Sequence, residues 1–412
     1  MEVIVVTIGD ELLTGHTVDT NSAWMGRAMN ARGFSIAKRV TIGDSHNEIV
    51  ATIREALLQC DVVLVTGGLG PTSDDVTKKA LCQLSGSPLV LHQPSLRLIK
   101  EFLALRGYPL SSTNQAQALV PEACTALLNR LGAVPGMWFE IDGKILVSMP
   151  GVPYEMEYLM THEVLPRLED RFHPQPVLHR WAITQGIPEA MLADRLQLFE
   201  AGLPDFIRLA YLPSQGIIKL RLSAYDATPE QEETLNKKSA ELLLTIPDAV
   251  VGDSDESLSE IVGSLLIRKK KTLALAESCT GGYIAHLITQ VPGSSAYFKG
   301  GVVAYSNEVK VEVLGVNPAT LEAHGAVSTQ TAAEMADGVR KRLQADYALA
   351  TTGIAGPDGG TAFKPVGMVC VALATNETVV SETFQFGSHR SNNIIRTANT
   401  ALGKLIRELL LL

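Results

Sequence analysis

The chain has 412 residues, and 46% of them are hydrophobic while only 19% are charged, which excludes intrinsic disorder and predicts roughly two to four packed domains. The formal net charge of −9 excludes duplex nucleic acid as the main partner, although helix ends and glycine loops can still bind a small phosphate locally. The five cysteines form no CxxC pair, and no apolar stretch reaches the about 18–20 residues that span a bilayer, so we expect a cytoplasmic protein with reduced thiols and no membrane partner.

Residues 1–165 alternate strand and helix patterns, which is typical of an α/β domain whose parallel sheet is covered on both faces. Glycine-bearing turns after Ile8, Thr66 and Met149 fall at predicted strand ends, where such sheets bind their ligands. The first predicted elements are a strand over 3–9, a helix near Asn21–Arg32, a strand over 34–43, a helix over 46–59 and a strand over 61–68.

Glycine and acidic residues gather at these strand ends. In GGLGPTSDDVT (67–77) the backbone of a glycine loop is suited to phosphate, and nearby carboxylates are suited to a hard divalent cation such as Mg, Mn or Co. The loop matches neither a Walker GKS/T nor a GxGxxG pattern. A plainer interpretation is helix capping by the acidic pair of this loop and a simple turn at Asp10–Glu11. The candidate ligand-binding residues are Gly67, Gly68, Gly70 and Thr72, and the candidate metal ligands are Asp10, Glu11, Asp74 and Asp75.

The strand and helix patterns of residues 166–252 predict a small α+β domain with few chemically reactive groups. We interpret it as a linker or packing domain, with binding of a partner as the alternative. A polar, turn-rich stretch, VVGDSDESLSE (250–260), marks a boundary, after which residues 253–412 form a further α/β domain. The predicted elements around this boundary are strands over 181–187, 206–214 and 216–226, helices near Pro188–Leu198, Pro229–Leu244 and Leu258–Arg268, and a strand over 272–278.

The segment LALAESCTGG (273–282) places Ser278 at a strand-to-helix turn, with a helix opening at about Thr280 and Gly281. Free backbone N–H groups at such a turn can stabilise an oxyanion or hold a phosphate, and the glycines allow a ligand to approach closely. The simplest alternative is that Ser278 only caps the helix. Cys279 is a rival nucleophile, but no histidine pattern nearby would activate it, and we expect a buried core cysteine.

Lys310 follows a predicted strand in GGVVAYSNEVK (300–310), on the first turns of a helix that starts at about Ser306. An isolated lysine is usually a solvated surface charge. To act as a base near neutral pH its pKa must fall far below the usual value, a free-energy difference of about 4 kcal/mol that burial can supply. Serine–lysine pairs are a known alternative to serine–histidine pairs in amide hydrolysis.

Two further segments end near the same predicted site. In YALATTGIAGPDGG (347–360), Thr352 and the backbone from Gly353 onward are suited to a carboxamide or a phosphate, although DGG by itself is an ordinary turn. In FGSHRSNNIIR (386–396), Arg390 at the start of the last helix is suited to a bidentate phosphate contact, whereas His389 is expected at the surface.

Taken together, AESCTGG, YSNEVK and TGIAGPDGGTAFKPVG resemble the C-terminal domain of the CinA family (competence/damage-inducible protein A) and the related bacterial nicotinamide-nucleotide amidase. The resemblance covers about residues 255–410. It implies hydrolysis of nicotinamide mononucleotide to nicotinate mononucleotide and ammonia without a metal. It further implies that Ser278 attacks and Lys310 transfers the proton. Tyr305 is the third catalytic residue that the resemblance implies. The implied substrate-binding residues are Thr280, Gly281, Thr352, Gly353 and Arg390.

Residues 1–165 resemble the molybdopterin-binding (MoCF-like) fold and the N-terminal domain of the same family, through TIGDELLTG, GGLGPTSDDVT and MPGVPYEM. In some members that domain is a metal-dependent ADP-ribose pyrophosphatase, so the resemblance implies cleavage of ADP-ribose to AMP and ribose 5-phosphate, and also a homodimer. Ala133 stands where the family usually has threonine, which puts substrate contacts there in doubt. The alternative is an accessory protein that binds a molybdopterin-like ligand, or serves DNA uptake, without turnover in this domain.

Overall fold

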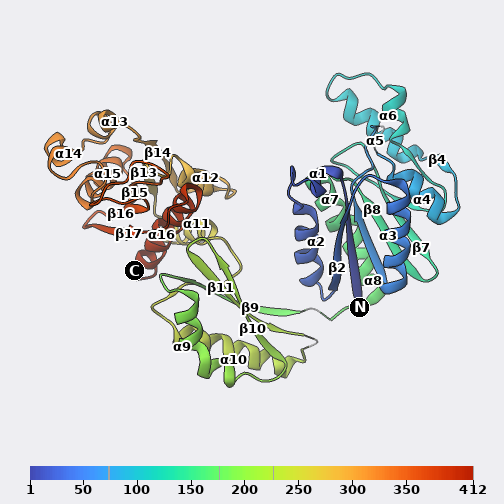
Figure 1. Ribbon diagram of the computed structural model, residues 1–412, viewed down its shortest axis with the longest axis horizontal. Helices are drawn as coiled ribbons and strands as arrows, with labels where there is room; N and C mark the ends of the chain where they lie inside the picture. The colour runs from blue at the N-terminus through green and yellow to red at the C-terminus, as the bar shows by residue number, and fades with distance from the viewer. Residues whose placement is uncertain (73–74, 176, 226, 412) are drawn as a thin grey trace. The chain divides into compact units, whose positions relative to one another are not determined.

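The computed structural model describes residues 1–72, 75–175, 177–225 and 227–411. These residues group into two compact units, Met1–Leu178 with Tyr225–Thr228, and His179–Ala224 with Pro229–Leu412. Helices cover sheets in both units, so the predicted α/β class is confirmed (Figure 1). Along the described ranges, no helix is long and apolar enough to cross a membrane.

The first unit is built on a sheet with the strand order β2-β1-β3-β8-β7-β6. The strands β2, β1, β3 and β8 are parallel, and β7 and β6 are antiparallel to their neighbours. A separate antiparallel pair is formed by β4 and β5. The strand bounds are β1 Glu2–Ile8, β2 Ser35–Ile42, β3 Val62–Thr66, β4 Leu89–Leu91, β5 Leu119–Pro121, β6 Thr125–Leu127, β7 Gly136–Ile141 and β8 Lys144–Met149.

Helices pack on both faces of this sheet because each central strand is apolar on both sides. One face carries α3 and α4, and the opposite face carries α2, α7 and α8 (Figure 1). The helix bounds are α1 Asp10–Leu13, α2 Thr20–Asn30, α3 His46–Gln59, α4 Thr77–Ser85, α5 Gln93–Ala104, α6 Ser112–Ala116, α7 Pro153–Leu159, a π-helical turn Met160–Val164 and α8 Leu165–Phe172. Residue 165, where the sequence predicted a boundary, therefore lies inside a continuous helical run.

The second unit contains the segment that the sequence predicted as a small α+β domain. Its sheet has the order β10-β11-β9-β12, and α9 and α10 connect its strands. Ile183 of β9 and Val251 of β12 belong to the same core as the C-terminal helices, so this segment packs directly on the rest of the unit. The bounds are β9 Leu178–Gln185, α9 Glu189–Ala201, β10 Ile207–Ser214, β11 Ile217–Ala224, α10 Pro229–Thr245 and β12 Val250–Gly252.

The remainder of the second unit surrounds a sheet of order β14-β13-β15-β16-β17. The strands β14, β13 and β15 are parallel, whereas β16 is antiparallel to β15 and β17 is antiparallel to β16. The bounds are α11 Leu258–Lys269, β13 Leu273–Glu277, α12 Tyr283–Thr289, a 3-10 turn Ser294–Ala296, β14 Phe298–Val303, α13 Asn307–Glu312, α14 Pro318–His324, α15 Thr329–Leu343, β15 Tyr347–Gly353, β16 Met368–Ala374, β17 Val379–Gln385 and α16 Arg390–Leu411.

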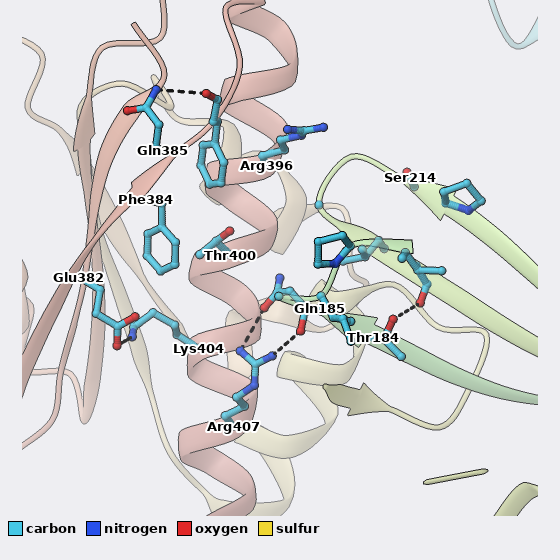
Figure 2. Close-up of a pocket in the computed structure, with 18 of the residues that line it drawn as sticks. Thr184, Gln185, Ser214, Glu382, Phe384, Gln385, Arg396, Thr400, Lys404 and Arg407 are labelled. Carbon is cyan, nitrogen blue, oxygen red and sulfur yellow. Dashed lines mark hydrogen bonds and ion pairs between the residues drawn. The ribbon is translucent and has the colours of Figure 1, made fainter. Parts of the chain in front are cut away.

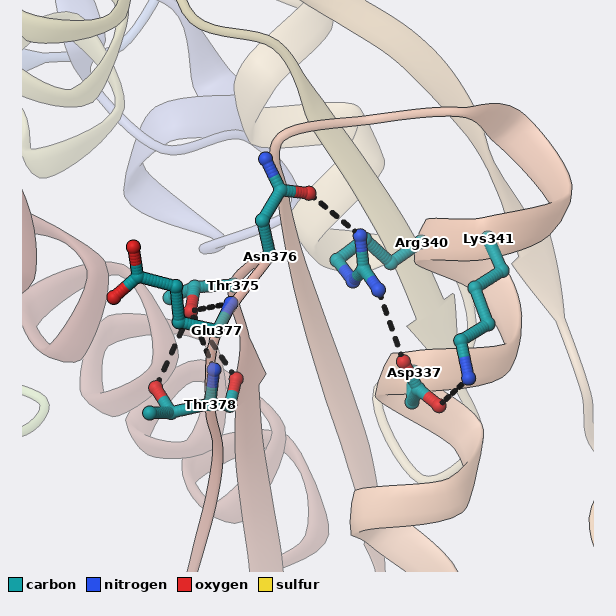
Figure 3. Close-up of polar contacts among 7 residues, drawn as sticks. All are labelled: Asp337, Arg340, Lys341, Thr375, Asn376, Glu377 and Thr378. Carbon is teal, nitrogen blue, oxygen red and sulfur yellow. Dashed lines mark hydrogen bonds and ion pairs between the residues drawn. The ribbon is translucent and has the colours of Figure 1, made fainter.

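The two faces of this sheet carry side chains of different size. Leucine and valine point to the face covered by α11, α12 and α16, while alanine points to the face covered by α15. Small side chains let α15 lie close to the sheet. Its end is tied to the β16–β17 turn by Arg340, which donates to Asn376 at 2.7 Å and also pairs with Asp337 (Figure 3).

The strand directions determine where the functional segments meet. Because β17 runs in the same direction as β15, the carboxyl ends of β13, β14, β15 and β17 all lie along one edge of the sheet. The segments that follow these strands contain Ser278, Tyr305, the loop after Gly353, and Arg390. Residues more than 100 positions apart in the sequence are therefore brought to one place by topology alone.

We expect alanine substitutions at two helical glycines to have opposite effects. A Cβ at Gly338 of α15 would lie 1.8 Å from the Leu314 carbonyl oxygen, whereas a Cβ at Gly26 of α2 would meet only the movable guanidinium of Arg39. Gly338→Ala should therefore destabilise its unit by about 1–3 kcal/mol. Gly26→Ala should be neutral or stabilising by up to about 1 kcal/mol, because alanine favours the helix. Thermal unfolding of both variants checks this, and equal destabilisation would contradict it.

Candidate functional site

Ser278 lies directly after β13, in a turn that the neighbouring strand holds in place. Its backbone N–H donates to the Thr351 carbonyl at 2.9 Å. The turn continues through Gly281 and Gly282, whose φ angles of 61° and 97° are in the left-handed region that favours glycine. The helix α12 begins only at Tyr283, so the predicted start at about Thr280 was early by one turn.

Glu277, the last residue of β13, has a structural role that was not predicted from the sequence. Its carboxylate is 2% exposed and accepts hydrogen bonds from the N–H groups of Gly282 at 3.0 Å, Ile284 at 3.1 Å and Ala285 at 2.8 Å. This carboxylate therefore accepts from the first N–H groups of α12. The sequence suggested that these groups are free to bind a ligand, and the structure shows that they are not. A glutamate at the end of an otherwise apolar strand was the available signal.

Lys310 lies in α13 and is 1% exposed. Its Nζ lies 3.1 Å from Ser278 Oγ, so the predicted contact between the hydroxyl and the amine is present. The amine also donates to the carbonyl oxygen of Ala304 at 2.8 Å and lies 3.3 Å from that of Tyr305. Throughout the described ranges, no carboxylate contacts this amine. Burial therefore lowers the pKa of Lys310, and the nearby exposed Glu308 carboxylate offsets only part of this effect.

Cys279 has the opposite character. Its side chain is buried in the core below α12, and burial raises the pKa of the thiol to about 12. A thiol with such a pKa is almost entirely protonated near neutral pH and is a poor nucleophile. The geometry thus favours Ser278 over its neighbour, in agreement with the predicted core position of Cys279.

A cavity of about 220 Å³ opens beside the serine and the lysine. Besides these two residues, its lining includes Tyr305, Thr352, Gly353 and Arg390 from the predicted set. The lining residues outside the predicted set are Cys279, Asn307, Ala326, Val327 and Ala355. Ala326, Val327 and Ala355 form an apolar part of the wall, and these small side chains carried no chemical signal in the sequence. Asn307, in the YSNEVK segment, adds a polar amide that the prediction did not use.

The polar residues at the mouth of this cavity are held by one another. Arg390 donates to the Gly356 carbonyl at 2.9 Å and to the Tyr305 hydroxyl at 3.2 Å, while Tyr305 itself is 62% exposed. A guanidinium has five N–H groups, so donors remain for an anionic group outside the cavity. Deeper inside, the Thr352 hydroxyl donates to the Ala326 carbonyl at 2.7 Å, which leaves its oxygen free to accept.

The remaining predicted residues of this domain support the site from behind. The buried Thr280 hydroxyl lies 2.7 Å from that of Thr351, and neither lines the cavity. Gly281 is exposed and shapes the turn. A Cβ on Gly353 would lie 2.8 Å from the Met368 carbonyl oxygen, so this position on β15 requires glycine.

In the first unit the glycine turns after β1, β3 and β8 meet at one edge, as predicted. Asn21 joins two of them by donating to Thr66 Oγ1 at 3.2 Å and to the Gly151 carbonyl at 2.8 Å. A cavity of about 110 Å³ lies here and is lined by Gly67 among others. A Cβ on Gly67, whose φ is 110°, would lie 2.1 Å from the Ile8 carbonyl oxygen, so only glycine fits.

The predicted metal ligands are placed differently from the expectation. Asp75 accepts from the N–H groups of Gly70 at 2.8 Å and Thr72 at 2.9 Å, so its carboxylate closes the glycine loop. The Asp10 backbone N–H donates to the Asp44 carboxylate at 3.0 Å, and the Asp44 backbone N–H donates to the Asp10 carboxylate at 3.2 Å. The Glu11 carboxylate lies over Gly9, Gly68 lies outside the cavity, and Asp74 falls outside the described residues.

Across the residues that the structure covers, no group of three His, Cys, Asp or Glu side chains is arranged to hold a metal ion. Hydrogen bonds within the loops engage the carboxylates of Asp10 and Asp75, while Glu11 lines the cavity.

Comparison with known proteins gives matches to both ends of the chain. The family model "CinA C-terminal domain" matches residues 255–409, and the model "Probable molybdopterin binding domain" matches residues 4–170. A CinA-like protein of Flavobacterium psychrophilum is 42% identical over 416 residues, covering 100% of this chain and 99% of that protein. One of Cytophaga hutchinsonii is 41% identical over 406 residues, covering 98% and 97%.

Among solved structures, a competence/damage inducible protein, CihA, from Agrobacterium tumefaciens is 41% identical. That match covers 36% of this chain and 94% of the solved chain, with a TM-score of 0.36.

Proposed function

Because the chain belongs to the CinA-like proteins, with a molybdopterin-binding-like domain and a CinA C-terminal domain, we propose that its C-terminal domain hydrolyses nicotinamide mononucleotide to nicotinate mononucleotide and ammonia. One observation carries the proposal. Ser278 Oγ lies 3.1 Å from an amine that is buried without a carboxylate partner among the described residues. A neutral amine beside a hydroxyl is the arrangement that serine–lysine amide hydrolysis needs.

The first half-reaction follows from the contacts of Lys310. A neutral amine has two N–H groups and one lone pair, and the carbonyls of Ala304 and Tyr305 accept the two N–H groups. The lone pair then faces Ser278 and takes its proton while the oxygen attacks the amide carbon. When the C–N bond breaks, the ammonium returns that proton to the leaving nitrogen, which departs as ammonia. An acyl ester on Ser278 remains.

The second half-reaction uses the same pair of residues. A water molecule gives one proton to the neutral Lys310 amine and attacks the ester carbon. The Ser278 oxygen leaves with that proton from the ammonium, and the product acid gives its remaining proton to solvent and is released as the nicotinate carboxylate.

The substrate contacts follow from size and charge. A cavity of about 220 Å³ accommodates a pyridine ring and its amide, but the ribose and the phosphate must remain at its mouth. The oxygen of Thr352 is free to accept from the amide nitrogen, and the unused N–H groups of Arg390 are available to the phosphate. Tyr305, which accepts from Arg390, would then flank the ribose.

Substitution of the two neighbouring nucleophiles separates their roles. Ser278→Ala should lower the rate of ammonia release from nicotinamide mononucleotide by at least about 1,000-fold, because the attacking atom is lost. Cys279→Ala should keep the wild-type rate, because the thiol is protonated and faces the core. An enzymatic ammonia assay on both purified variants measures this. Loss of activity in the cysteine variant alone would refute the serine mechanism.

The pH dependence of kcat/KM should follow the deprotonation of Lys310. Burial lowers the pKa of Lys310, and only the neutral amine accepts a proton, so kcat/KM should rise with pH and reach a plateau once the amine is deprotonated. The inflection should lie well below the ordinary lysine pKa. The exposed Glu308 carboxylate raises the pKa of Lys310, so Glu308→Gln should move the inflection to lower pH at low ionic strength. A shift to higher pH would contradict this assignment.

For the N-terminal domain we propose hydrolysis of ADP-ribose to AMP and ribose 5-phosphate. The convergence of three glycine turns on one cavity supports this second activity, since such turns allow a diphosphate to approach the backbone. The described residues form no ready cation site, so we assign no step to a metal.

Chelation tests whether a metal is needed. The family resemblance implies a metal-dependent reaction in this domain, so EDTA should abolish ADP-ribose cleavage and leave ammonia release unchanged. Chromatography resolves the products of both reactions. Ser278→Ala serves as the reciprocal control, because it should leave ADP-ribose cleavage intact. If EDTA stops ammonia release, the serine–lysine mechanism is wrong; if it spares ADP-ribose cleavage, the metal requirement is wrong.

A further inference from the structure

A second and larger cavity, of about 800 Å³, lies within the second unit between its middle segment and its C-terminal sheet (Figure 2). Its walls come from β17, from α16, and from the loops around β9 and β11. It shares no lining residue with the cavity at Ser278. The volume falls in the range of roughly 300–1,000 Å³ that is typical of small-molecule sites, which often occur where two domains meet.

One wall of this cavity is aromatic. Phe384 on β17 and Phe386 just after it have ring centroids 6.1 Å apart and ring planes inclined by 13°. Both rings are only partly buried, and Figure 2 shows Phe384 directed from β17 toward Thr400 of α16. Ile217 of β11 adds an apolar surface on the other side. Such walls favour a planar aromatic ring, which gains both dispersion and stacking contacts.

The charged side chains around the cavity differ in whether they have a partner within the protein. Lys404 is paired with Glu382, and the Arg407 guanidinium donates to the backbone and side-chain oxygens of Gln185 at 3.2 and 3.3 Å. The guanidinium of Arg396, by contrast, makes no hydrogen bond or ion pair with any residue that the structure describes. An uncommitted guanidinium beside aromatic rings favours an anionic group on the same ligand.

The cavity is formed before any ligand enters. Gln185 donates to the Asn399 carbonyl at 2.7 Å, and the Asn399 side chain donates to the Gln215 carbonyl at 2.7 Å, so the middle segment is fixed to α16 from both sides. Preformed walls reduce the entropy lost on binding. We propose that this cavity is a second ligand site for a planar aromatic ring carrying an anionic group, either a phosphate monoester or a carboxylate.

Calorimetric titration of the full-length protein tests the proposal, and the substitutions below separate binding at this cavity from binding of the same anions at the two proposed active sites. AMP represents the phosphate source, with adenosine as its neutral control, and nicotinate represents the carboxylate source, with nicotinamide as its control. We expect at least one anion to bind at least tenfold more tightly than its neutral counterpart. The stronger anion identifies the source.

Two substitutions assign that binding to the cavity. Arg396→Glu and Phe384→Ala should each weaken it at least tenfold, whereas Arg342→Glu, an exposed arginine of α15 outside the cavity, should leave it unchanged. Thermal unfolding checks that the Phe384→Ala variant is folded. If it is not, the Arg396→Glu variant still tests the proposal, because Arg396 is exposed and its substitution should not affect folding. If the anions bind at another site, their affinity will be unchanged by both substitutions, and the proposal will be wrong.

Three results would overturn the proposal. The first is the absence of binding heat for both anions at millimolar concentration. The second is an identical titration of Arg396→Glu and Arg342→Glu. The third is a dimeric mass in solution that Phe384→Ala alone converts to a monomer, because a second copy of the chain would then cover the cavity.

Discussion

The burial of one amine is the constraint on which the candidate site depends. Lys310 is among the largest fully buried side chains, and among the described residues its charge has no partner of opposite sign. A buried ammonium without a counter-ion is costly, so the fold favours the neutral form. The carbonyls around the amine fix its direction, and Ser278 occupies the position that remains. The amine can act as a base because, among the described residues, no carboxylate contacts it and stabilises its charged form.

The sheet brings this pair together at little cost. The strands present alanine on one face of the sheet, which allows α15 to pack closely against that face. Reversal at β16 and again at β17 returns the chain to the same edge, so the last helix starts beside the serine. The site thus combines four sequence segments, while each segment needs only a short loop.

Much of this arrangement was predictable from local patterns. Strand ends with glycine, the serine turn and the position of Lys310 in a short helix all follow from periodicity and from turn chemistry. The roles of Glu277 and Asp75 were not predictable, because a carboxylate looks alike in sequence whether it faces a ligand or the backbone. The tight packing of the middle segment on α16 was also hidden, since it depends on Gln185, an unremarkable residue until its partners are known.

The carboxylate of Glu277 also governs local motion. The first turn of a helix ordinarily frays, because its amides have only water as partners. In α12 those amides are held by a group inside the core, so fraying would require a charged side chain to leave the sheet. The end of β13 and the start of α12 are thereby joined across the short turn that carries the nucleophile, so the turn is anchored at both of its ends.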